Sequence, residues 1–140
     1  MTKLDLSDDS MCFACGKRNP DGLHLEFTET PDGLSTTIAF DERFQGYRDI
    51  VHGGLVSTVL DEAMVTLLNR TGVLALTAEL TIRFLAPVRI GEPITFTARL
   101  LGSRRNVHRV AAEATRDGET VARSEARFMS IGTTATQTEA

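Results

Sequence analysis

The chain has 140 residues, of which 41% are hydrophobic and none is Trp, so it has room for one domain with a single core and none for a second. No run of residues approaches the roughly 18 apolar residues of a membrane helix, and the polar, acidic start is unlike a signal peptide, so we expect a cytoplasmic protein that binds no membrane. A net charge of −4 argues against non-specific binding of nucleic acid, and because most of the 15 basic residues are Arg, any phosphate-bearing ligand must meet a local Arg cluster.

Residues 1–19 form an N-terminal segment with a CxxC motif, Cys12 and Cys15, and His24 follows shortly afterwards. A closed zinc site needs four ligands, and this part of the chain offers at most three unless two chains share the site. A redox pair is expected at the start of a helix in a thioredoxin-like pattern, whereas Asn19-Pro20-Asp21-Gly22 follows here. The simplest interpretation is two small residues in a turn, and we expect no metal and no cofactor.

Residues 23–27 and 34–40 both alternate apolar and polar side chains with a period of two, which is typical of strands. The segment between them, 31–33, has the composition of a turn, so the pattern predicts a hairpin. Residues 41–51 show no period and contain Gly46. They are predicted to be a loop that leads into a helix, and loops in this position often carry functional groups.

The next segment has the periodicity of a helix buried along one side, with apolar residues at Val56, Val59, Leu60, Ala63, Met64 and Leu67. A second stripe beside the first consists of Gly54, Ser57, Asp61, Val65 and Leu68. A glycine in residues 69–72 predicts the end of the helix. At the start, Gly53 and Gly54 leave backbone N–H groups at the positive end of the helix dipole, where an anion or a carbonyl oxygen can bind.

Period-two alternation follows the helix in residues 77–84, 94–100, 110–114 and 122–128. The inward-facing residues of the first two of these strands are predicted to be Ala78, Leu80, Ile82, Phe84, Ile94, Phe96, Ala98 and Leu100. Residues 116–119 have the composition of a hairpin turn, and the inward residues of the last two strands are small, which lets a sheet approach a helix closely. The pattern predicts an α+β fold in which a curved antiparallel sheet wraps one long helix, followed by a flexible tail at 132–140.

Asp61 is the candidate for chemistry on this helix. Glu62 points roughly opposite the apolar stripe, as a solvated helix residue does, whereas Asp61 lies on the flank of the stripe. A carboxylate in that position is partly desolvated unless another group pairs with it. Together with a helix N-terminus that can polarise a carbonyl oxygen, this carboxylate indicates acyl chemistry.

The motif His52-Gly53-Gly54, followed after six residues by Asp61, resembles the acyl-CoA thioesterases of the hotdog superfamily, of the phenylacetate-pathway (PaaI-like) type. Further resemblance to this family, in order and spacing, lies in residues 45–51, 76–87 and 123–126. The resemblance covers residues 20–131. It implies a hotdog thioesterase domain that hydrolyses an acyl-CoA thioester without a metal or prosthetic group.

The resemblance also implies roles for individual residues. The backbone N–H of Gly53, with Gly54 beside it, would bind the thioester carbonyl, and Asp61 would either activate water or attack the thioester to form a mixed anhydride. Thr77 has the position of a Ser or Thr that holds the water or the carboxylate in relatives. In a regular strand Thr77 shares its face with Glu79, so it reaches the site only if that face meets another subunit or the strand begins irregularly.

The residues just before the helix are candidates for substrate binding. His52 lies next to the helix N-terminus, where the dipole disfavours its protonated form, so we expect it to fix the loop rather than to act as a general base. Gln45 and Gly46 lie where relatives place a polar group near the reacting carbonyl. Because Gly46 has no side chain, that role would fall to Gln45.

Arginines are the candidates for binding the CoA phosphates. Arg104 and Arg105 form the densest basic cluster, and Arg83, Arg89 and Arg109 are further candidates. Exposed arginines are usually only solvated, so a plain surface role competes with this interpretation.

Two other functions are compatible with the same fold. A non-catalytic acyl-CoA or acyl-carrier binding module would keep Gly53 but would have no need for Asp61. A hydratase would usually carry an Asp and His pair five residues apart after a strand. The histidines of this chain have no such partner; they are His24, His52 and His108.

The separation of Gly53 and Asp61 predicts a site shared by two chains. Eight residues of helix span about 12 Å, whereas the carbonyl donor and the attacking group must each stand about 3 Å from the reacting atoms. Two antiparallel copies of the helix on a two-fold axis would bring Gly53 of one chain opposite Asp61 of the other. We therefore expect a homodimer with two shared active sites, and the sequence does not distinguish it from a tetramer of two such dimers.

Overall fold

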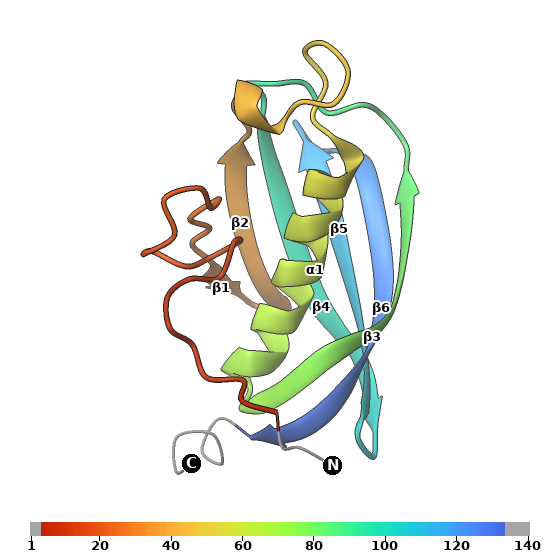
Figure 1. Cartoon of the computed structure of the whole chain (residues 1–140). Helices are drawn as coiled ribbons and strands as arrows, with labels where there is room; N and C mark the ends of the chain where they lie inside the picture. The colour runs from red at the N-terminus through yellow and green to blue at the C-terminus, as the bar shows by residue number, and fades with distance from the viewer. Residues whose placement is uncertain (1–3, 134–140) are drawn as a thin grey trace.

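The computed structural model describes residues 4–133, which contain one long helix and six strands. In chain order the elements are β1 (Thr28–Thr30), β2 (Gly33–Ala39), the short 3-10 helix η1 (Glu42–Phe44), α1 (Gly53–Arg70), β3 (Val73–Phe84), β4 (Pro93–Arg104), β5 (Val107–Arg116) and β6 (Glu119–Thr133). The strands form one antiparallel sheet in the order β1-β2-β4-β5-β6-β3, which curves around α1 (Figure 1). The predicted α+β hotdog fold is confirmed.

Helix α1 lies against the inner face of the sheet and forms the centre of the core (Figure 1). Its buried residues are Val56, Val59, Leu60, Ala63, Met64 and Leu68. This stripe differs from the predicted one at its end, because Leu68, expected on the flank, is buried and Leu67 is only half-buried. The helix ends at Arg70, and Gly72, with a φ of +93°, turns the chain into β3 as predicted.

The central strands face α1 with alternate residues, as the period of two predicts. The buried set is Ile94, Phe96 and Ala98 of β4, Val110, Ala112 and Ala114 of β5, and Ala122, Ala126 and Phe128 of β6. The many alanines let the helix pack closely on the sheet. Leu100 departs from the prediction and is 47% exposed. It lies beyond the start of β2, where Gly33 pairs with Arg99, so no strand covers it on that side.

Strand β3 is an edge of the sheet and departs from the predicted alternation. Its pairing with β6 shifts between Thr77 and Glu79, so Ala78 forms a bulge and is exposed. Phe84, expected to point into the core, is 53% exposed at the end of the strand. The predicted inward set holds between these points, with partly buried side chains at Leu80 and Ile82.

The first predicted strand, residues 23–27, is wrong, and the hairpin is made by β1 and β2 instead. His24 has a φ of +52°, which interrupts an extended backbone. The N–H of Leu25 donates a 2.9 Å hydrogen bond to the carbonyl of Ala14, and the Leu25 side chain is buried. This segment therefore packs against the N-terminal segment, which local alternation does not reveal.

The described residues before β1 and at the end of β6 complete the fold. Residues 4–27 contain neither helix nor strand and run past α1 (Figure 1). There the Cys12 thiol contacts the Glu62 carboxylate. Of the predicted tail, 134–140 lie outside the described residues, and Gly132 and Thr133 are the last residues of β6. Among the helices of residues 4–133, none has the length and apolar character that crossing a membrane requires.

Candidate active site

Asp61 and Thr77 meet between the helix and the edge strand. The Thr77 hydroxyl donates a hydrogen bond of 2.8 Å to Oδ1 of Asp61. Thr77 pairs with Phe128, which is buried beneath the helix, so its side chain faces α1. In a regular strand Thr77 would share the outer face with Glu79, and the extra residue Ala78 reverses this orientation. Of the two alternatives left open for Thr77, the irregular strand is the one that brings its side chain to Asp61 within one chain.

The Asp61 carboxylate is half-buried and has no cationic partner. The salt bridges within residues 4–133 do not include it. Burial raises the pKa of Asp61 above the ordinary aspartate value, and the hydrogen bond from Thr77 opposes this rise. A carboxylate with a raised pKa is a stronger base than a solvated one, so Asp61 is suited to accept a proton.

The first turn of α1 offers one free backbone donor rather than the two predicted. The N–H of Gly54 donates a 2.9 Å hydrogen bond to Nδ1 of His52, which is the N-cap of the helix. The N–H of Gly53 has no hydrogen-bond partner within residues 4–133, and it lies at the positive end of the helix dipole. His52 thus holds the loop to the helix, and among the described N–H groups of the first turn only that of Gly53 is left to bind an oxygen atom.

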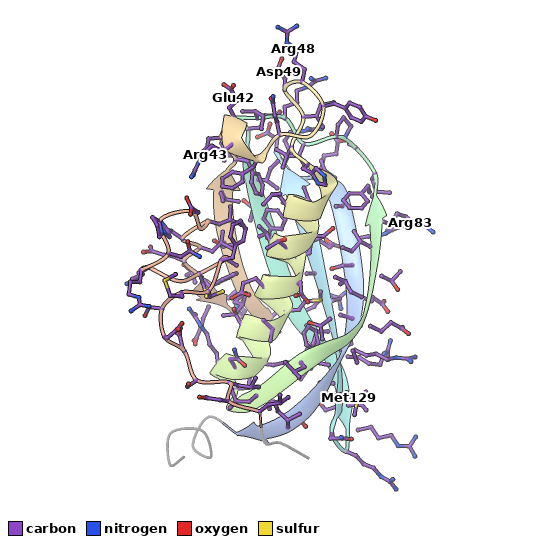
Figure 2. The ribbon with its side chains drawn as sticks, in the orientation of Figure 1. Glu42, Arg43, Arg48, Asp49, Arg83 and Met129 are labelled. Carbon is purple, nitrogen blue, oxygen red and sulfur yellow. The ribbon has the colours of Figure 1, made fainter. Side chains whose placement is uncertain are left out.

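The loop before the helix is a small closed turn. The N–H of Asp49 donates to the side-chain Oε1 of Gln45 at 3.3 Å, so Gln45 is bonded within its own loop. A Cβ at Gly46 would lie 3.3 Å from Cα of His52, which places this glycine directly against the cap of α1. Arg48 and Asp49 lie at the tip of the loop (Figure 2). The role of Gln45 and Gly46 in substrate binding stays a prediction.

An apolar pocket of about 330 Å³ opens beside the first turn of α1. Its lining residues are Ile50, Val51, Val56, Phe84, Leu85, Ala86, Pro87, Val88 and Ala122. The ring of Phe84 joins the pocket to the helix start, since it lies 3.6 Å from the position of a Cβ at Gly53. A hydrocarbon group in this pocket would therefore lie next to the free N–H. Sequence analysis missed this pocket because its members come from four separate segments.

The family model of the thioesterase superfamily matches residues 49–123, which is more than half of the chain and includes Gly53, Asp61 and Thr77. The chain belongs to the thioesterase superfamily. A comparison with curated proteins finds no match.

Several solved structures share this fold. The PaaI protein from the phenylacetic acid degradation operon of E. coli is 23% identical, with a TM-score of 0.73, and the match covers 79% of this chain and 82% of that one. A phenylacetic acid degradation-related protein from Ralstonia eutropha JMP134 is 27% identical, with a TM-score of 0.70 and coverage of 76% and 85%. The smu.793 protein from Streptococcus mutans UA159, bound to acetyl CoA, is 20% identical, with a TM-score of 0.73 and coverage of 78% and 90%. The predicted PaaI-like resemblance is confirmed.

In this thioesterase superfamily member, Arg104 and Arg105 lie far from the helix start within one chain. They occupy the hairpin between β4 and β5, at the end of the sheet opposite Gly53 (Figure 1). Strand β4 has 12 residues and begins near the helix entrance, so its two ends are about 36 Å apart. With Arg109 and Arg127 they line a surface depression of about 700 Å³, which gathers four guanidinium groups.

The remaining arginine candidates lie on other parts of the molecule. Arg83 projects from the outer side of β3, away from α1 (Figure 2). It lines a groove of about 570 Å³ on the outer face of the sheet, where Arg109 and Glu125 form an ion pair at 3.7 Å. Arg89 lies in the segment before β4 and pairs through its backbone with Ile50, at the same end of the molecule as Gly53.

The N-terminal cysteines meet the helix at Glu62. The ligand atoms of Cys12, Cys15 and Glu62 all lie within 4.8 Å of one another, and all three residues are half-buried. The prediction of a solvated Glu62 is therefore wrong, because the N-terminal segment covers that side of the helix. His24 lies elsewhere, with Nε2 2.5 Å from the carbonyl of Asn19. Burial, together with Glu62 and Cys12, raises the pKa of Cys15 above the usual thiol range, which opposes a reactive thiolate.

Proposed function

We propose that this protein hydrolyses an acyl-CoA thioester to a free acid and CoA. The observation that carries the proposal is the half-buried Asp61 carboxylate, which accepts a 2.8 Å hydrogen bond from the Thr77 hydroxyl and forms no salt bridge within residues 4–133. Membership of the thioesterase superfamily supports thioester chemistry. The free N–H of Gly53 supplies a group that can polarise the carbonyl.

The two groups divide the reaction between them. The Gly53 N–H donates to the thioester carbonyl oxygen and stabilises the negative charge that develops as the carbonyl carbon becomes tetrahedral. In one form of the reaction Asp61 takes a proton from a water molecule whose oxygen adds to that carbon, the C–S bond breaks, and the CoA thiolate takes the proton back. In the other form an Asp61 oxygen adds directly, the thiolate leaves, and water opens the mixed anhydride. In both, Thr77 fixes the orientation of the carboxylate.

The acyl group is assigned to the apolar pocket beside Gly53. The pocket has a volume of about 330 Å³ and its walls are hydrocarbon side chains, including Phe84, Leu85 and Pro87. The pocket adjoins the helix start, because a Cβ at position 53 would lie 3.6 Å from the Phe84 ring. This arrangement favours an apolar acyl group over a charged one.

Two chains are needed to complete the site. Gly53 and Asp61 are eight residues apart on α1, about 12 Å along its axis, so one helix cannot place both at one carbonyl group. Strand β3 ends the sheet, and its outer edge has no partner strand within residues 4–133. Large apolar side chains are exposed on and just after this strand, at Leu76, Phe84 and Leu85. These features support a homodimer, alone or within a tetramer, in which α1 of each chain runs antiparallel to its copy.

The same two-fold arrangement accounts for the position of the arginine cluster. Within one chain Arg104 and Arg105 are separated from Gly53 by the length of β4. In an antiparallel pair, the hairpin of one chain comes to the helix-start end of its partner. We assign Arg104 and Arg105, with Arg109 and Arg127 around the same depression, to the CoA phosphates of the partner's substrate.

A binding module is the second candidate, because the Streptococcus mutans structure holds acetyl CoA, an intact thioester. The experiment is a panel of aryl-, short-chain and long-chain acyl-CoAs, assayed for release of free thiol and, in parallel, for binding by calorimetry. Saturable thiol release with at least one class is the result expected. Binding of the panel without thiol release above the uncatalysed rate would establish the binding module instead.

A further inference from the structure

The cluster of Cys12, Cys15 and Glu62 takes no part in the proposed hydrolysis, and its ligand atoms lie close enough together to hold a metal ion. Two donors of one tetrahedral zinc ion stand about 3.5–3.8 Å apart, given metal–ligand lengths of about 2.0–2.3 Å. Sγ of Cys12 lies 3.8 Å from Oε1 of Glu62, and all three ligand atoms lie within 4.8 Å of one another. Small side-chain rotations would therefore bring these atoms to zinc-binding distances.

The backbone of the CxxC turn fixes the positions of the two sulfurs. The N–H of Cys15 donates a hydrogen bond to Sγ of Cys12 at 3.4 Å. The N–H of Gly16 closes the turn on the carbonyl of Cys12 at 2.8 Å. A Cβ at Gly16 would lie 2.5 Å from the backbone of both Cys12 and Ser10, so only glycine fits this turn. The turn thus directs both sulfurs to the same side, toward α1.

The ion pairs formed within residues 4–133 do not involve this cluster. Among the side chains of residues 4–133, no Lys or Arg forms a salt bridge with Glu62. We propose that Cys12, Cys15 and Glu62 bind one Zn²⁺ ion, which ties the N-terminal segment to α1. On binding, the two thiols release their protons to solvent, and the two thiolates and the carboxylate together leave the site with one net negative charge. Water would take the fourth tetrahedral position.

The spacing of residues in the sequence argued against zinc because the third ligand of this site comes from a distant segment. The sequence offered His24 as the third ligand, but its ring is turned to the carbonyl of Asn19. The structure supplies Glu62 instead, which lies fifty positions after Cys12 on the central helix. Because Glu62 follows Asp61 directly, the ion would hold the N-terminal segment against α1 next to the proposed active-site carboxylate.

The test uses full-length protein purified under reducing, anaerobic conditions and loaded with Zn²⁺ or Co²⁺. We expect one bound Zn²⁺ per chain, thiolate-to-cobalt absorption with Co²⁺, and a higher Tm with Zn²⁺ than without. Glu62→Gln should weaken zinc binding at least about a hundredfold, since even outer-shell partners of a metal are worth about 10–100-fold in affinity. Glu29→Gln, at an exposed carboxylate of β1, and His24→Asn should bind zinc as the wild type does.

Zinc affinities are compared by competition with a chromophoric chelator, in variants whose circular dichroism spectra match the wild type. Cys12→Ser and Cys15→Ser should each abolish the cobalt absorption. Where a serine variant does not fold, Glu62→Gln decides, because it preserves the shape of the side chain. A reduced wild-type protein that binds neither ion, or a Glu62→Gln variant with wild-type zinc affinity, would overturn the three-ligand site.

Discussion

Asp61 and Glu62 are consecutive carboxylates in the middle of one helix, and their surroundings differ completely. Asp61 faces the bulged edge strand and accepts a hydrogen bond from Thr77, whereas Glu62 faces the N-terminal segment and lies beside Cys12 and Cys15. Both side chains are half-buried. One step along a helix turns the side chain by about 100°, so each carboxylate meets a different covering segment. The two carboxylates are buried to a similar degree, and their different neighbours explain why we propose a base at Asp61 and a metal ligand at Glu62.

The largest expected effect comes from Asp61→Asn, which tests the proposed role of the carboxylate beside Thr77. Turnover of the best acyl-CoA should fall at least about a hundredfold, because an amide can neither accept the proton nor attack the thioester. Thiol release at saturating substrate measures it, and zinc content should not change. Asp32→Asn, the same substitution at an exposed turn, is the matched control. Equal turnover in the Asp61→Asn variant and the wild type would reduce Asp61 to a structural residue.

Gly53→Pro tests whether the Gly53 N–H binds the thioester carbonyl at the site of Asp61, because proline has no N–H. Proline suits the first helical position, and His52, with φ −57° and ψ 131°, already has a conformation favoured before proline. Helix content should therefore be retained while turnover falls about a hundredfold, as expected for loss of one oxyanion donor. Gly53→Ala keeps the N–H, and its Cβ would meet Phe84 at an ordinary 3.6 Å. If both variants lose equal activity, another group binds the carbonyl.

A smaller effect is expected from Thr77→Val, which leaves the carboxylate but removes its hydrogen bond. That bond lowers the pKa of Asp61 against the rise caused by burial, so its loss should raise the pKa further. Because the ionised carboxylate is the active form, the acidic limb of kcat against pH should move to higher pH, with about a tenfold loss on that limb. Thr77→Ser keeps a hydroxyl and should keep the wild-type limb. A limb that stays in place or moves to lower pH in Thr77→Val contradicts this role.

Local patterns were sufficient for the parts of the site that lie on α1. The apolar period predicts the helix and puts Asp61 on its partly buried flank, and Gly72 marks its end, because these features depend on residues within a few turns of one another. The alternation of the central strands is local in the same sense. The fold class and the position of Asp61 therefore follow from the sequence, together with the resemblance carried by the glycines and Asp61.

The remaining features depend on contacts between distant segments. The bulge at Ala78 is set by pairing with β6, and only this pairing shows which way Thr77 points. Glu62 is covered by Cys12, fifty positions earlier, and by the neighbouring Cys15. The capping of the Gly54 N–H by His52 is nearly local, but it depends on a side-chain rotamer rather than on spacing. No periodicity of the sequence encodes any of these arrangements.

The central claim is that each active site takes Gly53 from one chain and Asp61 from another. Chains carrying Asp61→Asn and chains carrying Gly53→Pro, each inactive alone, are mixed and allowed to exchange, with two different tags to verify the heterodimers. Random pairing makes about half of the dimers mixed, and each mixed dimer holds one intact site, so the mixture should recover about a quarter of wild-type turnover. No recovery in verified heterodimers, or full activity of wild-type protein shown to be monomeric in the assay, would contradict the shared site.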